Sequence, residues 1–132
     1  MNARLQYCDD FLEILNFTHN PEDERGGNPY NCSFCIRVKS GCYEGFADGC
    51  ECDYKKLKEF VSQLTALYLF ETQGVEFEEI GYGSKIAFSA DGLGHISVSG
   101  TIFGDAMTHS LTFEFVTDQT AYPTFIQELS QF

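Results

Sequence analysis

Cysteine is the residue type of this chain with the widest choice of chemistry, and two pairs have the close spacing of metal ligands. Cys32 and Cys35 have the spacing of a zinc knuckle, and Cys50 and Cys52 would have to supply two more thiolates. A strand over 32–38 would place Cys32 and Cys35 on opposite faces, because side chains alternate along a strand. We therefore expect reduced thiols and no metal, and structural zinc remains the alternative. The six cysteines are Cys8, Cys32, Cys35, Cys42, Cys50 and Cys52.

Catalysis by a thiol would need a neighbouring base. The three histidines, His19, His95 and His109, are not brought to any cysteine by the sequence. Phosphate-binding glycine motifs and the Gly-x-Ser-x-Gly elbow are absent. Glu78 and Glu79 are adjacent in an expected strand and would face opposite sides, which disfavours a paired general acid and base. The sequence predicts no catalytic residue and no cofactor, and a small thiol or metal enzyme is the least favoured class.

Acidic side chains are the remaining candidates, because 20 Asp and Glu outnumber 8 Lys and Arg and give a formal net charge of −12. This balance disfavours nucleic acids and anionic membranes as partners. It is compatible with two interpretations, simple solubility or a docking face for a basic protein. The candidate partner-binding residues lie in an early loop, in a hairpin and on one strand: Glu22, Asp23, Glu24, Glu44, Asp48, Glu51, Glu76 and Glu78.

The length of 132 residues fits one domain, residues 1–132. Acidic residues interrupt the first 15 residues, where a signal peptide would need a continuous apolar stretch. No segment approaches the roughly 18 apolar residues of a membrane span. We therefore expect a cytoplasmic protein whose thiols stay reduced.

The elements that position these residues follow from hydrophobic periodicity. A polar segment over 18–31, with two prolines and two adjacent glycines, predicts a long surface loop. The apolar residues of 54–69 recur at helical spacing, which predicts a helix. The apolar residues among the last twelve residues have the same spacing and predict a second helix, with Pro123 in its first turn. Strands are predicted at 11–17, 34–38, 42–52, 75–80, 85–90, 95–103 and 110–117.

Local signals mark the ends of these elements. Asp53 is the expected N-cap of the first helix, and Asp48 with Gly49 indicates a β-bulge inside the third strand. Gly92 and Gly94 suit a tight hairpin turn. The order βββα-ββββα predicts an α+β fold, with two helices on one antiparallel sheet of about seven strands.

Three stretches resemble the WapI family of bacterial immunity proteins, which are antidotes to contact-dependent polymorphic toxins. They are Asn-Cys-Ser-Phe-Cys-Ile-Arg-Val at 31–38, Gly-Leu-Gly-His-Ile-Ser-Val-Ser-Gly at 92–100, and Leu-Thr-Phe-Glu-Phe-Val-Thr-Asp-Gln-Thr at 111–120. The resemblance covers about residues 11–132. Cys32 stands where the family usually has Trp. The matched residues Gly92, Gly94, Asp118 and Thr120 look structural, as turn and capping residues.

The resemblance implies a bacterial, cytoplasmic immunity protein that binds its cognate toxin stoichiometrically and catalyses nothing. The implied partner is the C-terminal domain of a secreted polymorphic toxin, often a nuclease with a basic groove that a chain of charge −12 would suit. We place the contact face on the acids of the 18–31 loop and the first hairpin. The alternative is an acidic protein-binding or regulatory module with no toxin partner.

Overall fold

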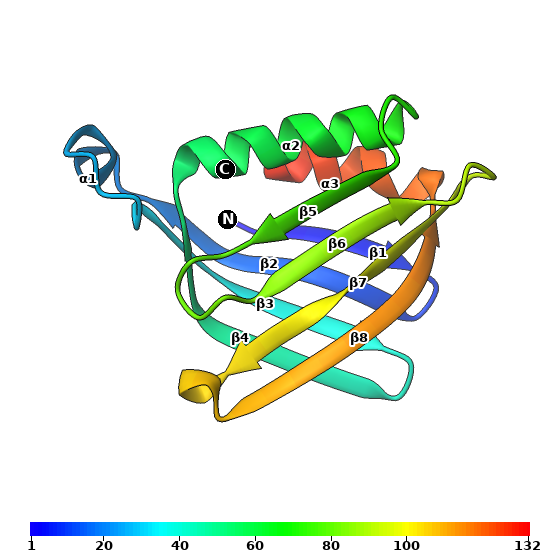
Figure 1. Cartoon of the computed structure of the whole chain (residues 1–132), viewed down its shortest axis with the longest axis horizontal. Helices are drawn as coiled ribbons and strands as arrows, with labels where there is room; N and C mark the ends of the chain where they lie inside the picture. The colour runs from blue at the N-terminus through cyan, green and yellow to red at the C-terminus, as the bar shows by residue number, and fades with distance from the viewer.

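The computed structural model describes residues 1–132 as two four-stranded antiparallel sheets with three α-helices (Figure 1). The predicted α+β class is confirmed, but the single sheet of about seven strands is corrected to two sheets of four strands each. Two sheets can bury their apolar faces against each other, which one sheet with two short helices could not do. Sheet A contains β1 (Ala3–Tyr7), β2 (Asp10–His19), β3 (Cys32–Ser40) and β4 (Tyr43–Cys52) in this order. Sheet B contains β5 (Gly74–Glu78), β6 (Lys85–Ala90), β7 (His95–Gly104) and β8 (His109–Asp118).

Strand β1 is the one strand that the sequence analysis did not predict. Only Ala3 and Leu5 are buried in it, so its alternating pattern is too short to stand out. The turn into β2 contains Cys8 at φ 55°, a left-handed conformation that glycine usually adopts. Because no glycine stands there, the sequence gives no signal for this turn. Leu5 lies opposite Leu12 of β2, and both side chains are buried.

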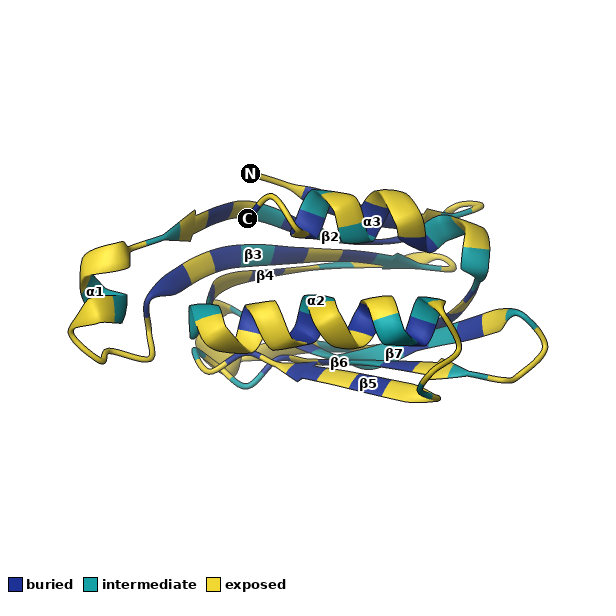
Figure 2. Cartoon of the chain, turned by 90° about the horizontal axis from the view of Figure 1, so that it is seen from above, coloured by how far each residue is buried: buried dark blue, intermediate teal, exposed yellow.

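The helices α2 (Tyr54–Tyr68) and α3 (Tyr122–Leu129) cover the side on which the sheets diverge (Figure 1). Figure 2 shows α3 beside sheet A and α2 beside sheet B, and the two helices also contact each other. Asp53 caps α2 as predicted, since its carboxylate accepts the Lys55 N–H at 3.2 Å. None of the helices is long and apolar enough to cross a membrane.

The core joins both sheets and both helices in one cluster of 29 buried residues. Phe60 of α2 lies 4.7 Å from Phe77 and 5.8 Å from Phe88, measured between ring centroids, which fixes α2 on sheet B. Burying one such ring contributes roughly 1.5–3 kcal/mol. On the opposite side β4 packs against β7 and β8. Gly45 permits the approach because a Cβ there would lie 3.2 Å from the Ile102 side chain of β7 and 2.7 Å from the Leu111 side chain of β8.

Two predicted local features are present. The pairing of β3 with β4 shifts between Phe34 and Ile36, opposite Asp48 and Gly49, so the bulge prediction is confirmed. The bulge bends β4 and brings Gly49 to the edge of the Tyr82 ring, from the β5–β6 connection. A short 3-10 turn over Gln119–Ala121 precedes α3, so the last helix begins at Tyr122 with Pro123 in its first turn.

Candidate functional site

The connection between β2 and β3, residues 20–31, projects beyond the sheets and is called the arm here (Figure 1). The predicted loop over 18–31 is partly corrected, because β2 runs on to His19 and Pro21–Arg25 form a short helix, α1. Asn20 starts α1 by accepting the N–H groups of Glu22 at 3.0 Å and Asp23 at 3.2 Å. No residue of α1 is buried, so this helix contributes no side chain to the core (Figure 2).

Asn31 fastens the arm to the start of α2 and is only 3% exposed. Its side-chain oxygen accepts the Tyr54 N–H at 2.8 Å. Its amide nitrogen donates to the Asn28 carbonyl at 2.8 Å and to the Asp53 carboxylate at 3.2 Å. The bond from Asn31 is the largest cause that holds the pKa of Asp53 below its usual value. The base of the arm is therefore pinned in one geometry.

A stack of side chains supports the same junction. The rings of His19 and Tyr54 lie 3.9 Å apart between centroids and are nearly parallel, at 12°. The Lys58 ammonium lies 4.7 Å from the centroid of the Tyr54 ring, at cation–π distance. His19 Nε2 lies 3.0 Å from Glu24 Oε1. Glu24 thus points back to the base of the arm, while Glu22 stays exposed.

The structure brings some of the predicted partner-binding acids together. Asp23 of the arm and Glu51 of β4 line one open hollow of about 530 Å³, together with Tyr30 and Ser33. The ion pairs of the chain involve neither of these two carboxylates. The hollow therefore presents uncompensated negative charge between the arm and sheet A.

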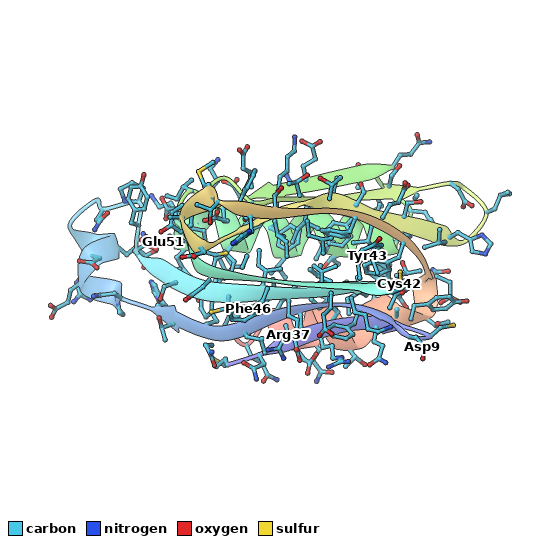
Figure 3. All side chains as sticks on the ribbon, turned by 90° about the horizontal axis from the view of Figure 1, so that it is seen from below. Asp9, Arg37, Cys42, Tyr43, Phe46 and Glu51 are labelled. Carbon is cyan, nitrogen blue, oxygen red and sulfur yellow. The ribbon has the colours of Figure 1, made fainter.

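The other predicted acids lie elsewhere. Asp48 is in the β4 bulge and accepts a weak hydrogen bond from the Cys35 thiol at 3.6 Å. Glu44 lies near the opposite end of β4 from Glu51, and Figure 3 shows the neighbouring Tyr43 far from Glu51. Glu76 and Glu78 are exposed on β5 of sheet B, as predicted.

Glu79 is a buried carboxylate whose role the sequence analysis missed. It is 1% exposed and accepts four backbone N–H groups at 2.6–3.0 Å, from Glu51, Gly81, Tyr82 and Ser84. The Ile80 N–H also donates to the Glu51 carbonyl at 2.8 Å. Glu79 therefore ties the β5–β6 connection, residues 79–84, to the edge of β4. A glutamate directly before a glycine-rich turn, Ile-Gly-Tyr-Gly-Ser, was the available signal.

The six cysteines are free, and three of them are buried. Burial raises the pKa of Cys32 to about 11 and also raises those of Cys50 and Cys52. Cys32 faces the core whereas Cys35 contacts Asp48, so the prediction that they lie on opposite faces is confirmed. No group of three or more His, Cys, Asp or Glu side chains is placed to hold a metal ion.

The motif residues of the C-terminal half connect elements to each other. Asp118 accepts the Thr120 N–H at 2.9 Å and also the Thr120 hydroxyl, at the start of the 3-10 turn. Gln119 donates through its side chain to the Tyr68 carbonyl at 3.3 Å and through its backbone to the Gly94 carbonyl at 3.2 Å. Gly92 and Gly94 have φ angles of 79° and 94° in the β6–β7 turn.

Comparison with known proteins identifies the family of the chain. The model of the WapI-like immunity protein family matches residues 11–132, which includes all three motif segments and the arm. No curated protein and no solved structure matches the chain. Because the match covers nearly the whole sequence, the chain belongs to the WapI-like immunity protein family.

Proposed function

We propose that this protein binds the C-terminal domain of a secreted polymorphic toxin and neutralises it by stoichiometric occlusion, without catalysis. The observation that carries the proposal is the family match over residues 11–132. Such a protein needs a surface that meets its partner, and the arm supplies one that the core does not require. The cytoplasm, where an incoming toxin would act, is the compartment that we propose for it.

The partner that we propose is basic. A net charge of −12 disfavours acidic partners and speeds encounter with cationic ones. Glu22 and Asp23 lie on the arm, and Asp23 lines the same hollow as Glu51 of β4. Carboxylates on a protruding element suit the phosphate-binding groove of a nuclease, so we propose a nuclease as the toxin.

Identification of the partner tests this function. The domain to use is the C-terminal domain encoded by the reading frame directly upstream, because immunity genes lie next to their toxin genes. We expect a complex with one copy of each chain, and we expect cells that express this protein to survive the toxin domain. A neighbouring frame without a toxin, or a toxin domain that neither binds nor is neutralised, would refute the proposal.

The electrostatic part has its own test. Glu22→Gln with Asp23→Asn removes two charges from the arm, and Glu76→Gln with Glu78→Gln removes two from sheet B. We expect the arm variant to lower the association rate about 3- to 10-fold at low salt, an effect that high salt erases. The sheet B variant should stay within about 2-fold of the parent. Equal rates for the two variants would remove the arm from the binding surface.

A further inference from the structure

Three separate segments meet at the arm end of the molecule. The hollow links Asp23 and Tyr30 of the arm to Glu51 of β4. Hydrogen bonds link Glu51 to Ile80 and to Glu79 in the β5–β6 connection. These contacts make one continuous surface, which we call the arm-end surface.

The arm-end surface exposes large apolar side chains. Tyr30 is 48% exposed, Ile80 41% and Tyr82 38%. The edge of the Tyr82 ring contacts Gly49, where a Cβ would lie 3.0 Å from the nearest ring carbon, so the missing side chain at Gly49 permits this close contact with β4. Exposed tyrosines beside an aliphatic residue are typical of the centre of a protein interface.

The two loop segments of this surface, the arm and the β5–β6 connection, are both held in place by hydrogen bonds. Asn31 pins the arm through Tyr54, Asn28 and Asp53. Glu79 holds the β5–β6 connection with four N–H bonds. A surface that is already ordered loses little conformational entropy on binding, which favours tight association.

From these observations we propose that the toxin domain docks on the arm-end surface and inserts a lysine or arginine side chain into the hollow between Asp23 and Glu51. This inference rests on the proposed function and names the place and chemistry of the contact. Tyr30, Ile80 and Tyr82 provide the apolar contact around the inserted cation. The two free carboxylates provide its charge partners, and Tyr30 offers a ring beside it.

The exposed aromatic residues near the other end of β4 lack this combination. Tyr43 and Phe46 of β4 are 68% and 47% exposed, but Arg37 already lies 5.4 Å from the centroid of the Phe46 ring. The hollow beside Phe46 is smaller, about 210 Å³. Figure 3 shows Tyr43 at the end of β4 away from Glu51. This second patch therefore serves as the matched control.

The decisive experiment measures binding of the purified upstream-encoded toxin domain to the full chain by surface plasmon resonance. The test variant combines Tyr30→Ser with Glu51→Gln, and the control combines Tyr43→Ser with Glu114→Gln, which changes an exposed acid of β8. We expect Kd to rise at least about 30-fold for the test variant and to stay within about 3-fold for the control. Parent-like binding of the test variant, or an equal or larger loss in the control, would overturn the placement.

A charge substitution gives a second, independent readout. Ile80→Arg places a cation on the arm-end surface, and Val116→Arg places one on sheet B at a site of similar exposure, 49%. We expect only Ile80→Arg to weaken binding, and thermal unfolding should show both variants folded. Equal binding by both variants would overturn the placement, whereas failure of the parent chain itself to bind would refute the proposed function.

Discussion

Replacing the buried Glu79 by glutamine should destabilise the protein strongly, although the side chain keeps its size. Oε1 accepts the N–H groups of Tyr82 and Ser84, and Oε2 accepts those of Gly81 and Glu51. An amide NH₂ cannot accept, so at least two N–H groups lose their partner whichever way the amide turns.

The magnitude follows from this count. A hydrogen bond to a charged group contributes about 1.5–3 kcal/mol, so two lost bonds cost about 3 kcal/mol or more. For a chain of this size that corresponds to a fall in Tm of about 9 °C. Urea unfolding followed by circular dichroism measures the free energy of unfolding, and calorimetry measures Tm. Glu78→Gln is the matched control, because this neighbour is exposed and should change stability by less than about 0.5 kcal/mol.

Two outcomes would refute the reasoning. If Glu79→Gln cost less than about 1 kcal/mol, the four N–H groups would not depend on the carboxylate. If Glu78→Gln cost as much as Glu79→Gln, the loss would reflect charge and not the buried bonds.

Three further predictions follow from the same structure. Asn31→Ala should lower the free energy of unfolding by about 2–3 kcal/mol. Hydrogen exchange should become faster only in the arm and at the start of α2, and a uniform increase over the whole chain would contradict the role of Asn31 in fastening the arm. Since the pKa of Asp53 is lowered in the folded state, its contribution to stability should be complete above pH 4–5 and be lost as the pH falls through the folded pKa. Asp53→Asn should therefore flatten the stability curve below about pH 4, and an unchanged acid limb in urea titrations would contradict this. A thiol reagent such as Ellman's reagent should label the exposed Cys8 and Cys42 quickly, and it should label the buried Cys32, Cys50 and Cys52 only when the protein unfolds. Rapid labelling of all six cysteines would contradict the burial of these three.

The sequence predicted much of the local structure because local signals are strong there. The helix over 54–69 was recognised from apolar residues on one face, and Asp53 was recognised as its cap. The bulge at Asp48 and Gly49 was predicted because this turn dipeptide lies inside a strand, and the segment after it is too short to form another strand. Such patterns depend only on neighbouring residues, so they can be read without knowing what packs against them.

The candidate site was harder to predict. The acids of the arm were identified, but nothing in the sequence indicated that Glu51 would line the same hollow as Asp23 while Glu44 would not. Alternation along β4 gives the face of each residue, but not which segment lies next to it. Glu79 was expected to face the opposite side of the strand from Glu78, but only the fold of the β5–β6 connection shows that it is buried and which N–H groups it accepts.

Composition and periodicity by themselves determined the acidic charge, the α+β class, seven of the eight strands and the main helix, because these depend on residue types and on spacing along the chain. The tertiary structure alone decided that the strands divide into two sheets, that the arm projects, and that Tyr30, Glu51 and Tyr82 share one surface. These properties depend on contacts between residues far apart in sequence, such as the bond from Glu51 to Glu79 and the packing of β4 on β7. Those contacts form only when two apolar faces are buried together, and no local pattern records which faces will meet.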